Sequence, residues 1–365
     1  MLSTRSRRML HRWRSITTTA VAALLLFIGA SSPASAGEGS WFNLGGDARA
    51  QSASYSAVIG GNLYEVVRGS DNNIWFRYNN GTWRALGGFQ DARTASPPRI
   101  IEFPPGRALV VVRGYDSEIW YTQGNSGSAN FWTPWRQFST GAWAMGSPWL
   151  SVDSTGGSPA LRIDVPRYDG RINYRYVWPW NLESNGNIPS TAGREWTYSQ
   201  GFQLAGTSRD IEGEGQIALW GYGYPEWQSY FTGTNNHVYR ARTDQRNGQL
   251  TQVNEVPGNA VCNSGVSAGR LGNQTTVVEP GRGGFREQQS ILISCVGTDG
   301  LVWINTSADG GEVWVGWRHA SGTPAPTTSA PAVNATYSEF TLTIRWNGAR
   351  SSLYPNNAIV AKKLS

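Results

Sequence analysis

The sequence predicts an all-β chain folded as a single β-propeller, with six blades of four antiparallel strands and seven blades as the alternative. Three observations predict this fold. A turn motif followed by an aliphatic and an aromatic residue recurs six times, at intervals near fifty residues. The composition, with 44 Gly, 18 Trp and 15 Tyr among 365 residues, suits many short strands joined by tight turns. The two ends of the chain supply complementary parts of one repeat.

The first 36 residues have the pattern of a removable secretory signal, which leaves residues 37–365 for the propeller domain. A stretch with five arginines precedes an apolar run, residues 20–30, that is too short to span a bilayer. Residues 34–36, Ala-Ser-Ala, fit a cleavage site. We therefore expect secretion after cleavage near Ala36, with no integral membrane anchor. Residues 6–10 resemble a twin-arginine motif, so the general and the twin-arginine export routes both stay open, and the bias of Arg over Lys is typical of bacteria.

Removing the signal also removes the basic character of the chain. The full chain has 31 Lys+Arg against 25 Asp+Glu, and five of these arginines lie in the signal, which holds no acid. The mature chain keeps 26 basic residues, a net charge of +1. Nucleic acid is therefore not a predicted partner, and neither is an anionic membrane surface.

The mature chain contains two cysteines, Cys262 and Cys295. In an exported protein we expect them to form one disulfide, which closes a loop of about thirty residues and stabilises the fold by about 3 kcal/mol. Two buried free thiols are the alternative. Its two histidines, His237 and His319, lack metal-ligand spacing, and no P-loop or nucleophile-elbow motif appears. No metal and no cofactor are predicted.

The first repeat shows the unit most clearly. Residues 63–67 alternate in the manner of a half-buried strand, and an earlier strand can be drawn at residues 54–59. A turn at Asp71 leads into residues 74–78, which are rich in β-branched and aromatic side chains. Residues 79–81, Asn-Asn-Gly, are a tight-turn signal, and the strand at residues 82–86 follows. The unit is therefore four antiparallel strands.

The other repeats share the pattern Gly-x-Asp-x-x-aliphatic-aromatic, which we call the Asp turn. It occurs three times in full, once with Asn235 in place of Asp, and twice more loosely. The copies, placed by their third positions, are at residues 71, 116, 169, 235, 299 and 350. Apolar strands are expected directly before most of them, at residues 108–112, 217–220, 290–294 and 340–344. Strands that begin with Trp follow several of them, at residues 83–86, 135–138 and 317–320.

The chain ends indicate how the ring closes. The sixth repeat stops after its third strand, without a Trp strand. The mature N-terminus instead begins with Trp41-Phe-Asn-Leu-Gly-Gly, which matches Trp83-Arg-Ala-Leu-Gly-Gly of the first repeat. We therefore expect the N-terminal strand to complete the last blade, because this pairing removes the exposed sheet edges of an open array.

Three segments depart from the compact repeat. Residues 178–187 lengthen a loop in unit three, residues 222–227 insert aromatic residues in unit four, and residues 281–287 are a polar insertion in unit five. The Pro-rich residues 323–331 resemble a linker, but too little chain follows them for another domain. We expect them to connect two blades.

The repeat resembles bacterial and fungal propeller lectins of the PLL-like and tectonin type. The resemblance is carried by the Asp turns and by the strands that begin with Trp, and it covers units one, two and five best. Its residues are Trp41, Asp71, Trp75, Trp83, Asp116, Trp120, Trp135, Asp299, Trp303 and Trp317. The resemblance implies binding of sugars, often fucosylated or methylated glycans, in pockets between blades. The same residues also hold a blade together, so they do not identify the ligand contacts.

Aromatic residues outside this framework are the predicted ligand contacts, because sugar C–H faces pack on Trp and Tyr rings. Five of them stand near Pro or Gly and are expected in loops, where binding residues concentrate. They are Trp178, Trp180, Tyr222, Tyr224 and Trp227. The alternative is that they plug the ring or cover an irregular blade.

Two other kinds of function stay open. Residues 307–314 fit the S-x-D-x-G-x-x-W Asp-box seen in sialidases, where the box is a structural turn remote from catalysis. A glycan hydrolase would need two carboxylates flanking the scissile bond, and the chain offers too many acidic residues to choose a pair. A secreted scaffold that binds a protein partner is the second alternative. Carbohydrate binding without catalysis is the function that the sequence favours.

Overall fold

The computed structural model describes most of the chain beyond the predicted signal. The described residues are 42–44, 50–86, 94, 96–125, 131–138, 141–153, 159–167, 172–182, 197–198, 216–221, 224–233, 235–244, 250–271, 275–278, 285–288, 290–321, 330–335, 339–345 and 359–364. None of the helices within these ranges is long and apolar enough to cross a membrane.

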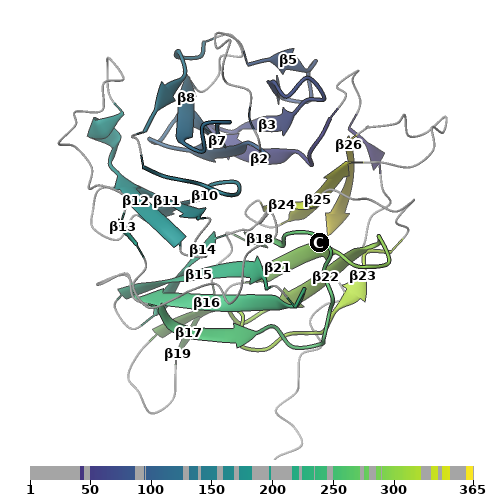
Figure 1. Ribbon diagram of the computed structural model, residues 1–365. Coiled ribbons are helices and arrows are strands. Elements are labelled where there is room, and N and C mark those ends of the chain that lie inside the picture. The colour runs from purple at the N-terminus through teal and green to yellow at the C-terminus, as the bar shows by residue number, and fades with distance from the viewer. Residues whose placement is uncertain are drawn as a thin grey trace, which may run out of the picture. The chain divides into compact units, whose positions relative to one another are not determined.

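The described residues form six four-stranded antiparallel sheets, the blades of a propeller (Figure 1). Blade 1 consists of β2 (Tyr55–Ile59), β3 (Asn62–Arg68), β4 (Ile74–Tyr78) and β5 (Arg84–Ala85). Blade 2 consists of β6 (Arg99–Glu102), β7 (Arg107–Arg113), β8 (Ile119–Asn125) and β9 (Arg136–Gln137). Blade 3 consists of β10 (Trp149–Asp153), β11 (Ala160–Pro166), β12 (Ile172–Val177) and β13 (Thr197–Tyr198), with the short 3-10 helix η1 (Pro179–Asn181) after β12.

The second half of the chain repeats this plan with one insertion. Blade 4 consists of β14 (Gln216–Gly221), β15 (Tyr224–Thr232), β16 (Val238–Asp244) and β17 (Leu250–Glu255). Blade 5 consists of β18 (Ser267–Arg270), β21 (Ile291–Val296), β22 (Val302–Ser307) and β23 (Arg318–His319), and the inserted hairpin is β19 (Thr275–Val278) with β20 (Phe285–Gln288). Blade 6 consists of β24 (Ala332–Ala335), β25 (Phe340–Arg345), β26 (Ile359–Leu364) and β1 (Phe42–Asn43).

The first strands of the blades form a closed circle. In chain order, each of β2, β6, β10, β14, β18 and β24 packs against the next, and β24 packs against β2. Six blades therefore account for the ring within the described residues. The alternative of a seventh blade, hidden between units three and four, is not needed to close it.

The N-terminal strand completes the last blade, as the matching chain ends predict. Phe42 pairs with Ala361, and Asn43 pairs with Val360, so β1 is the fourth strand of blade 6. Side chains also join blade 6 to blade 1, because the Asn334 carboxamide accepts from the Ser56 N–H at 2.7 Å and donates to the Ser54 carbonyl at 3.1 Å. The two ends of the chain therefore close one ring.

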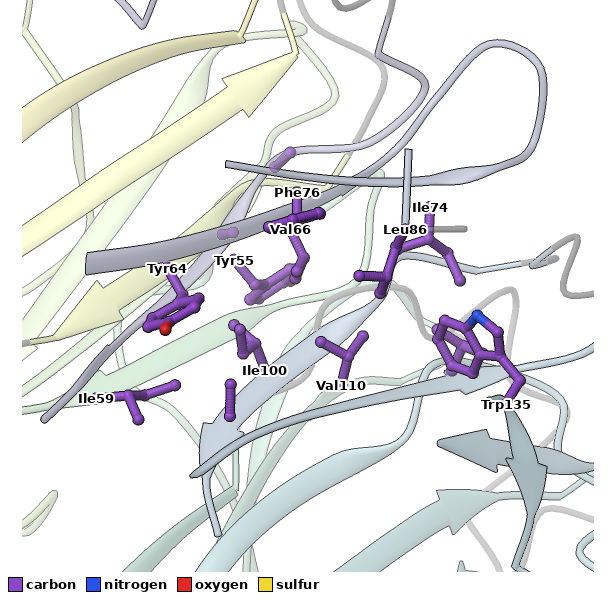
Figure 2. Packing of buried hydrophobic residues seen from close by; sticks show 14 residues of the cluster. Tyr55, Ile59, Tyr64, Val66, Ile74, Phe76, Leu86, Ile100, Val110 and Trp135 are labelled. Carbon is purple, nitrogen blue, oxygen red and sulfur yellow. The ribbon is translucent and has the colours of Figure 1, made fainter. Parts of the chain in front are cut away.

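Apolar side chains on facing sheets hold neighbouring blades together. Figure 2 shows the cluster between blades 1 and 2, in which Tyr64, Phe76, Ile100 and Val110 are buried. These residues follow from the period-two pattern of the strands, which sends every second side chain to the same face. Trp135, from the strand-like stretch predicted in unit two, belongs to this cluster. The Trp strands thus contribute packing between blades.

Unit four differs from the sequence-based expectation. Residues 217–220 do form a strand, β14, but it is the first strand of blade 4, and β15 stands between it and the Asp turn. The prediction that Tyr224 and Trp227 lie in a loop is therefore wrong. Pro225 pairs with Trp220 of β14, and pairing with β16 begins only at Glu226, so its missing N–H removes no bond to β16.

The remaining departures lie in units five and six. The polar insertion of unit five ends in β20, which pairs with β19 as a separate hairpin. Residues 323–331 lie between the last strand of blade 5 and the first strand of blade 6, as expected of a connection between blades, and most of them are outside the described residues. Leu353 and Tyr354 of the sixth Asp turn are also outside them, and the third strand of blade 6 begins at Ile359.

Candidate functional site

The Asp turns are built as caps of the blade hairpins. In blade 1, Asp71 Oδ1 accepts the Asn73 N–H at 3.0 Å and the Trp75 indole N–H at 3.2 Å. A Cβ on Gly69 would lie 2.4 Å from Asp71 Oδ1 and 2.7 Å from the Trp75 ring, so glycine is required beneath the indole. These side chains are therefore engaged with their own turn.

The same arrangement recurs in blades 2 and 5. Trp120 donates to Asp116 at 3.0 Å, and Trp303 donates to Asp299 at 3.2 Å. His319 Nε2 also lies 3.1 Å from Asp299. Of the other framework residues, Trp83 lies 5.1 Å from the Arg77 guanidinium, Trp317 packs in the core around the disulfide, and Trp41 is outside the described residues.

The two cysteines form the expected disulfide. Cys262 and Cys295 are bonded, with 5.9 Å between their Cα atoms, and both are buried. Cys295 belongs to β21, whereas Cys262 lies in the connection that precedes β18. The disulfide therefore fixes the entry to blade 5 against its second strand.

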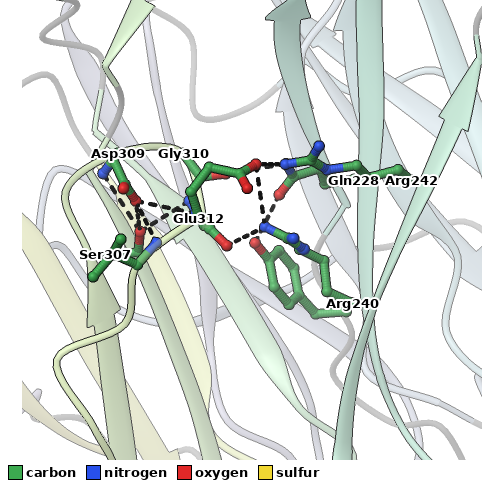
Figure 3. A network of polar contacts seen from close by, with 10 residues as sticks. Gln228, Arg240, Arg242, Ser307, Asp309, Gly310 and Glu312 are labelled. Carbon is green, nitrogen blue, oxygen red and sulfur yellow. Dashed lines mark hydrogen bonds and ion pairs between the residues drawn. The ribbon is translucent and has the colours of Figure 1, made fainter. Parts of the chain in front are cut away.

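The Asp-box is a turn that locks blade 5 to blade 4. Ser307 Oγ accepts the Gly311 N–H at 2.9 Å, and Asp309 Oδ1 accepts the Val313 N–H at 2.8 Å. Figure 3 shows the adjoining polar network, in which Gln228 donates to the Gly310 carbonyl at 3.0 Å and Arg242 pairs with Glu312. As the sequence comparison with sialidases predicts, this box is structural.

In blade 3, aromatic residues outside the repeat framework lie next to one another. Tyr174, Tyr176, Trp178 and Trp180 form a continuous row of rings, which we call the aromatic row. Adjacent ring centroids are separated by 6.0, 6.3 and 6.1 Å, and the last two rings are stacked with 15° between their planes. Trp178 is half-buried, and Trp180 is 56% exposed at the end of the row. The row therefore presents an open indole to solvent.

The strand period explains how the chain builds the aromatic row. Tyr174 and Tyr176 alternate in β12 with Asn173, Arg175 and Val177, so the tyrosines share one face of the blade. Val177 packs on the opposite face, in the core shared with blade 2. Leu182 is buried in that same core and closes η1 with a hydrogen bond to the Pro179 carbonyl. The buried Leu182 side chain therefore fixes the position of η1, the short helix that carries Trp180.

A buried ion pair lies beneath the tyrosines. Arg162 stands opposite Tyr176 across β11 and β12, and Asp164 stands opposite Tyr174. The Arg162 guanidinium donates to Asp164 through Nε and Nη2, at 3.1 and 2.7 Å, and its Cζ lies 4.6 Å from the Tyr174 ring centroid. The pair is almost wholly buried. The bidentate contact with Asp164 fixes the Arg162 guanidinium, which supports the row through its cation–π contact with Tyr174.

The charges at this site are fixed at neutral pH. Burial is the largest single influence on the pKa of Arg162 and lowers it, but the charges and hydrogen bonds of Asp164 and Tyr176 together outweigh burial, so the pKa lies above its ordinary value. Burial also raises the pKa of the Tyr176 hydroxyl, which stays protonated. A neutral phenol can both donate and accept hydrogen bonds with a hydroxyl-rich ligand. Asp164 is committed to Arg162 and is therefore poorly placed to serve as a catalytic acid.

No described interaction joins the other predicted ligand-binding residues to the aromatic row. Tyr222 lies outside the described residues, and Tyr224 and Trp227 have described backbone but undescribed side chains in β15. The sequence reasoning found Trp178 and Trp180 but missed Arg162, Asp164 and the two tyrosines. The signal for the tyrosines was their spacing of two residues before Trp178, which places Tyr174 and Tyr176 on one face of a strand.

The described residues contain no group of three His, Cys, Asp or Glu side chains that could hold a metal ion. The aromatic row supplies flat apolar surface and neutral hydroxyl groups instead. This chemistry suits a ligand with both C–H faces and hydroxyl groups.

Comparisons with known proteins place the fold but not the family. The sequence matches no protein-family model and no curated protein. A protein of unknown function from Dyadobacter fermentans is 9% identical, with a TM-score of 0.56, over 91% of this chain and 99% of that one. AofleA from Arthrobotrys oligospora is 10% identical, with a TM-score of 0.54, over 87% and 88%.

A third similar structure is a mutant of the Aleuria aurantia lectin in complex with Fucα1-6GlcNAc. It is 12% identical, with a TM-score of 0.50, over 85% of this chain and 98% of that one. At these identities the likeness concerns the fold alone. The finer resemblance to PLL-like and tectonin-type lectins stays a prediction.

Proposed function

We propose that this protein is a secreted, lectin-like propeller that binds carbohydrate through the aromatic row of blade 3. The observation that carries the proposal is the exposed indole of Trp180, stacked on Trp178 and fixed by η1. A soluble protein gains no stability from an indole held in water, whereas a sugar ring packs well on such a surface.

The chemistry around Trp180 favours a sugar over a purely apolar ligand. Tyr174 and Tyr176 continue the row inward and are partly accessible, so their hydroxyl groups stand near the apolar platform. Pyranose rings need this combination, because their C–H faces are apolar and their edges carry hydroxyl groups. The buried pair of Arg162 and Asp164 fixes the rings in advance, which lowers the entropic cost of binding.

A fucosylated glycan is the first ligand to test. The resemblance noted in the sequence implies fucosylated or methylated glycans, and the similar Aleuria aurantia lectin was solved with Fucα1-6GlcNAc. We propose binding without hydrolysis, since the one described carboxylate of the site is held by Arg162. A protein partner remains the alternative occupant of this surface.

A glycan array on residues 37–365 tests the function directly. We expect at least one glycan class to bind, and Trp180→Ala to weaken that binding about tenfold or more, because an aromatic contact and its buried area are lost. Phe131→Ala is the matched control, since Phe131 is an equally exposed aromatic residue of blade 2. Mass spectrometry of the bound glycan checks that it stays intact.

Four outcomes would contradict the proposal in different ways. Binding of no glycan removes the lectin function, and recovery of one stoichiometric protein partner without any effect of sugar favours a scaffold. Full binding by the Trp180→Ala variant keeps the function but moves the site away from the aromatic row. Release of a shortened glycan shows an enzyme.

A further inference from the structure

Trp143 is a second exposed indole among the described residues. It lies in the connection from blade 2 to blade 3 and is 56% exposed. Its φ is +47°, a conformation in which a large side chain is strained. Every other described non-glycine residue with positive φ is Asn or Ser. A small polar residue would satisfy this backbone better, so Trp143 is present for a reason other than the turn.

The backbone on both sides of Trp143 is held firmly. The Glu118 carboxylate accepts the Gly141 and Ala142 N–H groups at 2.9 and 3.0 Å. Ala144 donates to the Ser117 carbonyl at 2.8 Å. Ala142 and Ala144 are wholly buried. The indole therefore projects from a fixed segment and is not carried on a loose loop.

A buried arginine supports one face of this indole. The Arg167 guanidinium lies 4.9 Å from the Trp143 ring centroid, and Arg167 is only 7% exposed. Arg167 forms an isolated β-bridge with Ala144, as Gly114 does with Thr94 in blade 2. A guanidinium on one face disfavours a second cation on the other, so a neutral or anionic ligand is expected there.

Arg167 replaces the glycine of the Asp turn, and the replacement has a steric explanation. In blades 1, 2 and 5 the glycine lies beneath a Trp indole that leaves no room for a Cβ. In blade 3 the position of that Trp is taken by Asn173, which is buried and donates to the Ala142 carbonyl at 3.1 Å. The smaller residue makes room for Arg167, and the aromatic ring is supplied from the neighbouring connection by Trp143.

We propose that Trp143 is the centre of a second binding site, which takes a neutral or acidic pyranose on the exposed part of its indole. The site is distinct from the aromatic row. Asn173 marks the end of β12 that adjoins Trp143, and Trp178 follows the other end. Five residues of extended strand separate them by about 17 Å.

The two sites therefore open at opposite ends of blade 3. The Trp143 site stands on its own observations, whereas the pairing of two sites rests on the proposed function of the aromatic row. With both sites present, a single copy of the protein binds two sugars and joins two glycan-bearing surfaces.

Indole N–H resonances distinguish the two sites in one experiment. Protein labelled with ¹⁵N-tryptophan is titrated with methyl glycosides of fucose, galactose, mannose, N-acetylglucosamine and glucuronic acid at millimolar concentrations. Trp143→Phe and Trp180→Phe assign the two resonances. We expect the Trp143 resonance to shift with at least one glycoside. No shift of this resonance with any of them overturns the second site, whatever the Trp180 resonance does.

A stability measurement separates a binding role from a structural one. Asn adopts positive φ readily, so Trp143→Asn should change the melting temperature by no more than about 2 °C. The same substitution is expected to abolish glycoside binding at this site. A large drop in melting temperature would show that Trp143 is a structural residue and would contradict the proposal. Phe131→Ala again serves as the control for an exposed aromatic residue.

Cross-linking tests the pairing of sites. Beads coated with a responding glycoside should aggregate with the wild-type protein, and Trp143→Asn and Trp180→Ala should each abolish aggregation while leaving one bound sugar per chain. Aggregation that survives either substitution in a monomeric protein would rule out the two-site arrangement.

Discussion

At the scale of single residues, the Asp turns show how two positions change together. In blades 1, 2 and 5 a carboxylate accepts from an indole N–H. In blade 4 the same positions hold Asn235 and Tyr239, and the Asn235 amide donates to the Tyr239 hydroxyl at 2.8 Å. An acceptor therefore faces a donor in both versions. In the fourth repeat the change from Asp to Asn is therefore matched by a change from Trp to Tyr, and the hydrogen bond of the motif is kept.

This pairing predicts a coupling between Asp71 and Trp75. Asp71→Asn should lower the free energy of unfolding by about 1 kcal/mol, because a charge-assisted acceptor becomes a neutral amide. Adding Trp75→Tyr recreates the blade 4 pair, so the double variant should be more stable than the sum of the single effects by about 0.5 kcal/mol or more. Urea unfolding measures all three variants. Simple additivity would contradict the donor–acceptor explanation.

At the scale of elements, blade 5 is the most heavily constrained. Its first and second strands are separated by the inserted hairpin β19–β20, and the disulfide encloses this insertion within a separation of 33 residues. The Asp-box adds the contacts to blade 4. Blade 5, which contains the inserted hairpin, is thus the blade that the disulfide stabilises.

The disulfide should contribute strongly to stability. Replacing both cysteines in Cys262→Ala/Cys295→Ala should lower the free energy of unfolding by about 3–4 kcal/mol, chiefly because the unfolded chain gains freedom. Denaturant unfolding of the variant, beside wild-type protein with and without reductant, measures the effect. If the reduced wild-type protein is as stable as the oxidised one, the loop constraint has no such role.

The strands of units one and two could be predicted closely, because their periodicity and turns agree. The predicted strand at residues 74–78 coincides with β4. Unit four could not be assigned in the same way, since Pro225 and the neighbouring Gly and Tyr residues suggest a loop while pairing partners decide for a strand. Likewise, Trp178 and Trp180 could be proposed from their surplus, but Trp143 could not, because its exposure depends on the left-handed backbone that Glu118 holds.

At the scale of the whole molecule, stability depends on a ring that is closed by a very short strand. β1 contributes two residues to blade 6, and Leu44 follows it with a carbonyl that accepts from Arg77. Arg77 also pairs with Glu65 in blade 1. The closing strand is therefore connected to both blades that it adjoins.

Removing residues 37–44 from a protein of residues 37–365 should weaken the whole ring. We expect the free energy of unfolding to fall by about 2 kcal/mol or more, because β26 loses its outer partner β1 while keeping β25, and Arg77 loses an acceptor. The exposed edge of β26 should also promote self-association, which light scattering detects. A synthetic peptide of residues 37–49 should restore the melting temperature when added in excess. An unchanged, monomeric truncated protein would contradict the closing role of β1.

The pairing of Phe42 with Ala361 also sets an order in time. The strands of five complete blades are synthesised after β1 and before its partner β26. During that interval β1 has no sheet to join, and the circle is missing one strand in its last blade. Completion of the ring thus requires that the strands of all six blades have been made. A chaperone or protease that recognises an unpaired strand could therefore distinguish unfinished copies from finished ones without reading any other feature.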